Sequence, residues 1–368
     1  MDIQIKQVVD YLESKVPLSL QESYDNCGLL VGNNNQLVGG ILLCLDVTED
    51  VLNEAIQLKC NLIIAHHPFI FSGIKKLTGA NSTQNILITA IKNDIAIYAG
   101  HTNYDNVDFG VNKIICEKLG LQNLKILAPQ KNSLLKLQTY VPTEHASSLR
   151  NAIFEAGAGS IGEYTNCSFN TEGTGTFKAS IEAIPFVGEK NKNHLEPETK
   201  IEVIFPSYIQ SKVISALIKN HPYQEVAYDI IALQNSNPKI GAGMIGELSN
   251  EINETDLLKL ISERFNAEGI RHTNLLGKNV KKVAVCGGSG SFLLNDAIAN
   301  GADFFITADF KYHQFFDAEG KIVIADIGHF ESEQFTTELF FSLLKEKFST
   351  FAIHFSKTKT NPINYFKA

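Results

Sequence analysis

The chain has 368 residues, 44% of them hydrophobic, which is enough material for two domains with cores of their own. Its formal net charge is −8 and its Lys and Arg residues are scattered, which argues against nucleic acid as the main partner. No segment approaches the ~20 apolar residues of a membrane span, and residues 1–20 have the mixed pattern of an amphipathic helix rather than a signal peptide. Six scattered cysteines without a Cys-x-x-Cys pair predict reduced thiols in a cytoplasmic protein.

A strand, a helix and a second strand are expected at residues 40–45, 51–56 and 62–65, and the second strand ends in two adjacent histidines. Pro68 closes this strand because proline cannot donate to a β ladder. His66 and His67 therefore stand at the carboxyl end of a core strand, where open α/β sheets place their ligand sites. Neighbouring strand residues point to opposite faces, so the pair suits two adjacent ions better than one. The alternative is a core histidine beside a surface histidine.

The stretch from residue 131 to residue 234 has a different pattern from its flanks. It predicts a strand at 135–141, a helix at 144–156, a hairpin within 164–179, a strand at 201–205, a helix at 207–219 and a strand at 225–233. This order is the split β-α-β, ferredoxin-like arrangement. We therefore expect an inserted α+β domain at 131–234, with the polar loop 188–198 at its tip, in a core formed by residues 1–130 and 235–368.

The pattern of the first half returns after the insertion. Residues 282–286, 293–298 and 303–306 repeat the earlier strand-helix-strand unit at an offset of 242 (286 minus 44). The next strand is repeated at an offset of 228 (329 minus 101), so that Gly100-His101-x-x-x-Asp105 corresponds to Gly328-His329-x-x-x-Glu333. Four registers that agree in order indicate two related α/β halves.

Two such halves facing each other would bring five side chains to one place: His66, His67, Asp105, His329 and Glu333. Three imidazoles and two carboxylates suit Zn, Mn, Fe or Co rather than Ca or Mg. The set is larger than one catalytic ion with an open position uses, and it suits two ions with one bridging carboxylate. The alternative for both carboxylates is a capping role at the helices that follow them.

Seven short motifs occur in order along both ends of the chain: Tyr24-Asp25-Asn26-Cys27-Gly28-Leu29, His66-His67-Pro68-Phe69-Ile70-Phe71, His101-Thr102-Asn103-Tyr104-Asp105, Gly241-Ala242-Gly243-Met244-Ile245-Gly246, Cys286-Gly287-Gly288-Ser289-Gly290, Thr307-Ala308-Asp309-Phe310-Lys311-Tyr312-His313 and Gly328-His329-Phe330-Glu331-Ser332-Glu333. Together they resemble the Nif-three-like family, also called the GTP cyclohydrolase I type 2 homologues. The middle segment, with Gly159-Ser160-Ile161-Gly162-Glu163-Tyr164, resembles the PII-like insertion of longer members.

The resemblance implies a bilobal α/β core with a dinuclear metal centre. In that centre His66, Asp105 and Glu333 hold one ion, His67, His329 and Glu333 hold the other, and zinc is the first candidate metal. It also implies a homohexamer, and a metal-dependent hydrolase whose activated water attacks a nucleotide, at guanine C8 if GTP is the substrate. A dinuclear phosphohydrolase and a non-catalytic, metal-dependent binding or regulatory protein remain as alternatives.

Three further residues are candidate acid-base groups. His101, the repeat partner of His329, is expected to act as a proton shuttle or as a hydrogen-bond donor behind the ligands. Asp309 and His313 lie at the strand end that mirrors His66-His67, where they line the site or form a surface loop.

Two glycine-rich stretches and a group of phenylalanines leave their roles open. Residues 241–246 fit G-x-G-x-x-G but neither close a strand nor open a helix, so we do not expect a dinucleotide there. Residues 287–291 lie between a strand and a helix, where they bind a phosphate or allow tight packing. Phe340, Phe341 and the aromatic region 348–355 form a subunit interface or belong to the core.

Overall fold

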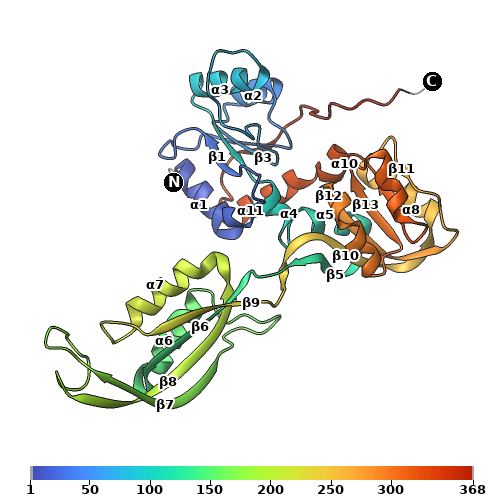
Figure 1. Ribbon diagram of the computed structural model, residues 1–368. Helices are drawn as coiled ribbons and strands as arrows, with labels where there is room; N and C mark the ends of the chain where they lie inside the picture. The colour runs from blue at the N-terminus through green and yellow to red at the C-terminus, as the bar shows by residue number, and fades with distance from the viewer. Residues whose placement is uncertain (1–2, 367–368) are drawn as a thin grey trace. The chain divides into compact units, whose positions relative to one another are not determined.

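The computed structural model describes residues 3–366, which divide into two compact units (Figure 1). Unit 1 combines Met1–Ala128 with Lys239–Ala368, and unit 2 is Pro129–Pro238. The site that concerns function lies in unit 1.

The first half of unit 1 is built on a five-stranded sheet with the order β1-β4-β3-β2-β15. Its strands are β1 (Gly28–Val31), β2 (Ile41–Cys44), β3 (Leu62–Ala65), β4 (Ala96–Ala99) and β15 (Ile353–Phe355). The strands β2, β3, β4 and β15 are parallel, and β1 runs antiparallel to β4. The chain thus returns to this sheet near its C-terminus, with Ile353 opposite Ile41.

The second half is built on a six-stranded sheet with the order β11-β14-β13-β12-β10-β5. Its strands are β5 (Gln122–Gln130), β10 (Asn237–Asn253), β11 (Arg271–His272), β12 (Asn279–Ser289), β13 (Phe304–Ala308) and β14 (Val323–Asp326). The strands β12, β13 and β14 are parallel, and β11 lies antiparallel on the β14 edge as β1 does on β4. The order β1-β4-β3-β2 therefore recurs as β11-β14-β13-β12, which agrees with the two related halves that the sequence repeat predicts.

Helices fill the space around both sheets. They are α1 (Ile5–Lys15), α2 (Glu49–Gln57), α3 (Ser82–Lys92), α4 (Thr102–Asp105), α5 (Val111–Leu119), α8 (Glu254–Phe265), α9 (Leu294–Ala299), α10 (His329–Glu333) and α11 (Thr336–Lys347), with a 3-10 helix at Tyr312–Ala318. Thr48 caps α2 by accepting a hydrogen bond from the Val51 amide, and Asn253 caps α8 through the Asp256 amide.

One hydrophobic core joins the two sheets of unit 1. Alternate residues of β2, such as Ile41 and Leu43, pack with α1, α5, α8, α11 and with Val283 and Val285 of β12. The intervening Leu42 and Cys44 point to the other face, which α2 and α3 cover. The shared core holds the carboxyl ends of the two sets of parallel strands in a fixed relation.

Unit 2 is a four-stranded antiparallel sheet with the order β7-β8-β6-β9 and two helices. Its elements are β6 (Leu134–Pro142), α6 (Ala146–Glu155), β7 (Phe169–Lys178), β8 (Asn193–Pro206), α7 (Gln210–Asn220) and β9 (Tyr228–Leu233). This connectivity is a split β-α-β arrangement. Two details of the sequence prediction are wrong: residues 164–179 do not form a hairpin, because β7 pairs with β8 along its whole length, and β8 begins inside the expected loop 188–198.

Several sequence alternatives are settled by burial and position. Phe340 and Phe348 are core residues, which favours the core interpretation of the C-terminal aromatics, although Phe355 is exposed. Residues 241–246 lie inside β10, so they form no nucleotide-binding turn. The six cysteines, all within the described residues, are free thiols. Between residues 3 and 366, no helix combines the length and apolar character that crossing a membrane requires.

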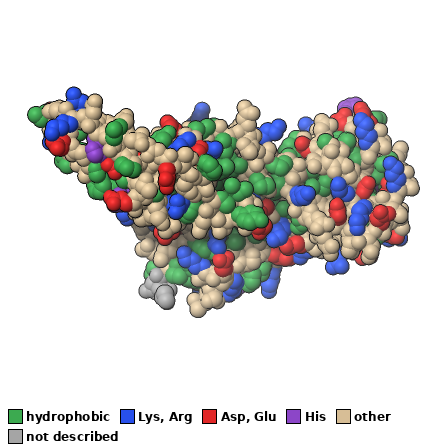
Figure 2. All heavy atoms as spheres, turned by 90° about the horizontal axis from the view of Figure 1, so that it is seen from below, with side chains coloured by type: hydrophobic (Ala, Val, Ile, Leu, Met, Phe, Trp, Pro, Cys, Tyr) green, Lys and Arg blue, Asp and Glu red, His purple; other side chains and the backbone are tan. Residues whose placement is uncertain are grey.

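Charged side chains are mixed on the face of the molecule that Figure 2 draws. Lys and Arg alternate there with Asp and Glu instead of gathering into one basic patch. This distribution agrees with the acidic net charge and gives no support to a nucleic-acid surface on that face.

Candidate metal centre

The site is formed where the parallel strands of both sheets end. Asp46 follows β2, His66 and His67 follow β3, and His101 follows β4. From the six-stranded sheet, Asp309 follows β13 and His329 follows β14 as the first residue of α10. The two sheets therefore present the same edge to one another, and the candidate ligands come from loops that the parallel strands position.

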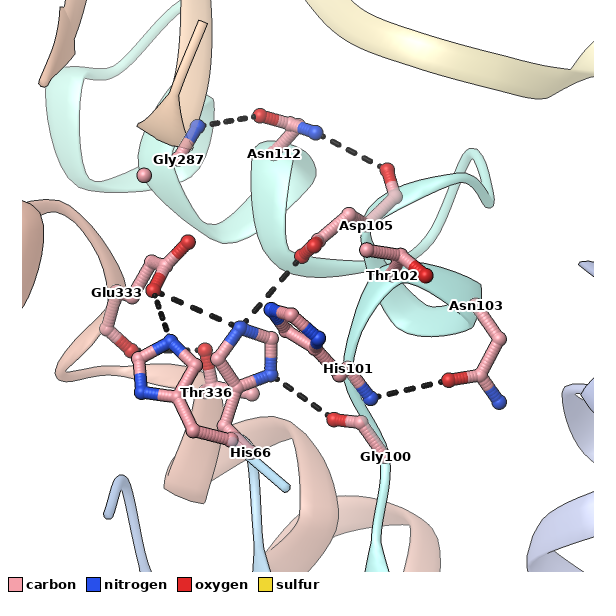
Figure 3. A network of polar contacts seen from close by, with 12 residues as sticks. His66, Gly100, His101, Thr102, Asn103, Asp105, Asn112, Gly287, Glu333 and Thr336 are labelled. Atoms are coloured by element: carbon pink, nitrogen blue, oxygen red, sulfur yellow. Dashed lines mark hydrogen bonds and ion pairs between the residues drawn. The ribbon is translucent and has the colours of Figure 1, made fainter. Parts of the chain in front are cut away.

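His66 and Asp105 face each other across a buried gap (Figure 3). His66 is fully buried and its Nδ1 donates to the Gly100 carbonyl over 2.9 Å, which leaves its Nε2 facing the gap. This Nε2 lies 3.7 Å from Asp105 Oδ1 and 3.6 Å from Glu333 Oε2. Within residues 3–366, both His66 Nε2 and Asp105 Oδ1 are buried without a hydrogen-bond partner.

His67 and His329 approach the same Glu333 oxygen from the other side. Their Nε2 atoms lie 2.9 and 3.0 Å from Glu333 Oε2 and 3.2 Å from each other. Each ring uses its Nδ1 to contact a carboxylate: His67 contacts Asp46 at 2.7 Å, and His329 contacts Asp309 at 2.7 Å. Carboxylates that accept Nδ1–H in this way direct both Nε2 atoms at one point, as at histidine metal sites.

Electrostatics at the cluster favour positive charge between its members. Burial would lower the pKa of His67, but its hydrogen bonds to carboxylates outweigh burial and raise the pKa to about 9. The same competition raises the pKa of His329 to about 11. Burial, with the negative charge of Glu333 nearby, raises the pKa of Asp105 to about 8.

Glu333 behaves in the opposite way. Burial would raise its pKa, but the positive charge of His66 and the hydrogen bonds of the histidines hold the pKa well below its usual range. A carboxylate that stays ionised in a buried position needs cations around it. Protons on the imidazoles meet that requirement, and metal ions in their place would meet it as well.

His101 forms a third element of the site. Its Nδ1 lies 2.9 Å from Asp25 Oδ1, and Asp25 also accepts a hydrogen bond from the Thr102 amide at 3.1 Å. Burial would raise the pKa of Asp25, but these partners lower it below its ordinary value. One His101 ring nitrogen lies within 4.8 Å of ring nitrogens of His66 and His67.

The glycine-rich loop at the end of β12 packs directly on the cluster. A Cβ on Gly288 would lie 2.4 Å from Glu333 Oε1, and the residue has a φ of +59°, so glycine is required on both grounds. The Gly287 amide donates to Asn112 Oδ1 at 2.9 Å, and the Gly288 amide donates to Ser332 Oγ at 3.0 Å. Of the two roles left open for this loop, these contacts favour close packing, because the amides are engaged within the protein.

The donor set fits a metal centre. Three sets of nitrogen and oxygen ligand atoms lie within 4.8 Å of one another: His66, Asp105 and Glu333; His67, His329 and Glu333; and His66, His67 and His101. The buried, unpartnered His66 Nε2 and Asp105 Oδ1 would each gain a bond from a cation placed between them. Imidazole and carboxylate ligands together suit transition-metal ions.

Comparisons with known proteins place the chain in a family. The model of the family Duf34/NIF3 (NGG1p interacting factor 3) matches residues 3–362. The chain belongs to the Duf34/NIF3 family. It is 36% identical over 365 residues to a protein of Bacillus subtilis and 38% identical over 363 residues to one of Halalkalibacterium halodurans. Both are named GTP cyclohydrolase 1 type 2 homolog, and each match covers at least 97% of this chain and 98% of the relative.

Solved structures agree with this assignment. A Bacillus cereus protein described as related to NIF3 superposes with a TM-score of 0.86 at 37% identity, over 100% of both chains. The resemblance inferred from the seven motifs is thereby confirmed, as is the two-lobed α/β core.

Within this Duf34/NIF3 fold, the structure brings all five predicted ligands together, while their metal-binding role stays a prediction. The three predicted acid-base residues differ in their position relative to the site. His101 lines the site, whereas Asp309 holds the His329 ring and so positions it. His313 is exposed on the 3-10 helix, where its ring packs against Tyr312 and Phe316. Among the described residues, no hydrogen bond or ion pair joins His313 to the cluster.

Sequence reasoning missed Asp46 and the C-terminal strap, residues 356–363. Asp46 could have been predicted from the sequence, since it follows a core strand at the edge of the sheet that bears the candidate ligands. The strap could not have been predicted, because its partners are remote in sequence. Thr360 Oγ1 donates to Asp46 Oδ2 at 2.7 Å, Asn361 Nδ2 donates to Glu331 Oε1 at 2.9 Å, and Ser356 Oγ donates to Glu54 at 2.6 Å.

Proposed function

We propose that the chain is a metal-dependent hydrolase that uses two divalent ions. His66, Asp105 and Glu333 would hold one ion, and His67, His329 and Glu333 the other, with Glu333 shared. The observation that carries the proposal is the buried pair His66 Nε2 and Asp105 Oδ1, which face each other at 3.7 Å without hydrogen-bond partners. Zinc is the first candidate metal, and Mn, Fe and Co suit the same ligands.

Divalent ions held in this way would lower the pKa of bound water and so supply hydroxide at neutral pH. The protein's own groups prepare the site for that chemistry. Asp46 and Asp309 fix the ring orientation and tautomer of His67 and His329. His101 donates its Nδ1–H to Asp25, so its Nε2 is free to accept a proton from water or substrate.

The names of the relatives direct the choice of substrate. They are called GTP cyclohydrolase 1 type 2 homologs, which supports a small, nucleotide-related substrate for this chain. Hydrolysis at a ring carbon suits the site better than phosphoryl transfer, since the Gly287 and Gly288 amides are engaged within the protein.

Metal analysis and product analysis test the proposal together. We expect about two ions per chain after reconstitution, and a mass change in at least one member of a panel of nucleotides, nucleosides and nucleobases. His101→Ala should lower turnover about 10²–10⁴-fold while the metal content is retained, as for loss of a general base. His313→Ala is the matched control and should retain turnover. A reconstituted protein with two ions and no turnover on any member would favour a metal-dependent binding protein.

We further propose that residues 131–234 act as a PII-like inserted domain and that the chain forms a homohexamer. The first proposal is supported by the compact unit Pro129–Pro238 and its β-α-β-β-α-β order. The second rests on family resemblance. Light scattering that gives a monomer mass of 40.6 kDa at micromolar concentration would refute the hexamer.

A further inference from the structure

A cavity of about 420 Å³ opens beside His67, His101 and His329. Phe69, Phe71 and Phe330 contribute aromatic walls, and Pro362 and Ile363 of the C-terminal strap contribute aliphatic ones. Asp46 is the single Asp or Glu in the lining, and within residues 3–366 no lysine or arginine lines the cavity. This lining has the features of a site for an apolar, ring-shaped group.

Four side chains that could contact a phosphate chain are engaged with other groups of the protein. Asn112 and Ser332 accept hydrogen bonds from the amides of the glycine loop. Arg271 donates to the Phe310 carbonyl and the Asp326 carboxylate, and it lines a different cavity. Asn361 donates to Glu331 and accepts from the Ile363 amide, so its amide group is also engaged.

The charge at the centre also opposes a polyphosphate. Five carboxylates contact the histidines or lie behind them: Asp25, Asp46, Asp105, Asp309 and Glu333. A triphosphate adds about four further negative charges close to that centre, which Coulomb repulsion disfavours.

The remaining features of the cavity favour a neutral planar ring. The ring of Phe71 is 60% exposed and lies 6.4 Å from that of His101, with the two planes at 77°. A large exposed aromatic at the mouth of a site is available for stacking. The free nitrogen of His101 is an acceptor for a ring N–H.

We propose that the substrate is an uncharged nitrogen heterocycle at the nucleobase or nucleoside level, recognised by the aromatic walls and His101, and not a nucleoside triphosphate. The inference rests on the proposed hydrolase function and narrows its substrate. It assigns the specificity of the site to Phe71, Phe330 and the strap residue Ile363.

The test is a binding measurement on the full-length, metal-loaded protein with matched ligand pairs. Guanosine and GTP, adenosine and ATP, and the free bases are titrated by calorimetry at low and moderate salt. The metal content is measured afterwards, because triphosphates chelate metal. We expect at least one nucleoside or base to bind at least tenfold more tightly than its triphosphate. Ile363→Lys, which puts a cation on the wall, should tighten triphosphate binding about tenfold, whereas Ile363→Met should not.

Two results of the binding measurement would overturn the inference. One is a triphosphate that binds as tightly as its nucleoside, or more tightly, with an affinity that salt weakens. The other is the absence of binding by every base and nucleoside to the loaded protein. Turnover of GTP would contradict the substrate inference but support the proposed hydrolase function. Tight binding of a nucleoside without any turnover would support the substrate inference but contradict the hydrolase function.

Discussion

Replacing Gly288 by alanine tests how closely the glycine loop determines the metal centre. The new Cβ would lie 2.4 Å from Glu333 Oε1 and 3.1 Å from His329 Cε1. The optimal separation of non-bonded heavy atoms is about 3.5 Å, so the carboxylate oxygen must retreat by about 1 Å. In addition, a left-handed backbone costs a residue with a side chain about 1–2 kcal/mol, and Gly288 has a φ of +59°.

The two effects of this substitution have different consequences. The backbone cost lowers the free energy of unfolding at any position where alanine replaces a glycine with a positive φ. Movement of Glu333 acts on metal binding, because ligand distances are tolerated only within about 0.2 Å. We therefore expect Gly288→Ala to lose about 1–2 kcal/mol of stability and to bind metal about 100-fold more weakly, the upper end of the range for disturbed ligand support.

Gly301→Ala is the matched control. Gly301 has a φ of +70°, and a Cβ there meets nothing within 4 Å. This variant should lose a similar amount of stability and retain its metal affinity. Denaturant unfolding of the ion-free proteins measures the first quantity, and competition with a chromophoric chelator measures the second. Equal metal affinities for the two alanine variants would refute the reasoning.

Four other outcomes are expected. Glu333→Gln should lower the occupancy of both ions, and Asp105→Asn should lower the occupancy of one. Elemental analysis after reconstitution measures the metal content. If the two variants lost the same amount of metal, the bridging role of Glu333 would be contradicted. Thr360→Val should weaken metal binding several-fold in chelator competition by freeing Asp46, and Thr360→Ser should restore it; a valine variant that matches the parent would contradict this. Because the pKa values of His67, His329 and Asp105 are all raised in the folded chain, their protonated forms stabilise it, so the thermal midpoint of the chelator-treated protein should fall as pH rises from about 6.5 to 8. Metal should abolish this slope, and a midpoint that rises over the interval would show that the sign is wrong. Deletion of residues 129–238 with a Gly/Ser linker should leave a core that still takes up metal, whereas a folded core without metal would show that unit 2 builds the site.

The parts of the fold that were predictable from sequence are those with local signals. The strands β2, β3 and β4 are short apolar runs bounded by breakers, and their repeat as β12, β13 and β14 indicates two related halves. The hairpin expected within residues 164–179 failed for a physical reason. Gly173 and Gly175 look like turn residues, yet they pair with Glu198 and Glu196 inside a long edge strand. Glycine there leaves room for the Glu198 carboxylate, which a Cβ on Gly175 would meet at 2.2 Å.

The candidate site also contains residues that were predictable from sequence and residues that were not. His66, His67, Asp105, His329 and Glu333 follow strands that recur in the repeat, so their meeting was predictable from register alone. The sequence left Asp309 between a position at the site and a surface loop, because its contact with the His329 ring depends on the spacing of two loops. Thr360 was not predictable, since its partner Asp46 lies 314 residues away and no periodic pattern links them.

The C-terminal strap has a consequence for the order in which the protein becomes complete during synthesis. The first sheet receives its edge strand β15 only when residues 353–355 have been made, and Asp46 receives Thr360 later still. His66, His67 and Asp105 leave the ribosome long before Glu333. A nascent chain shorter than 333 residues therefore has the early candidate ligands without the carboxylate that the proposed centre shares. On the proposed ligand set, metal loading would require a chain that extends at least to Glu333, and a chain that terminates earlier would lack the complete set.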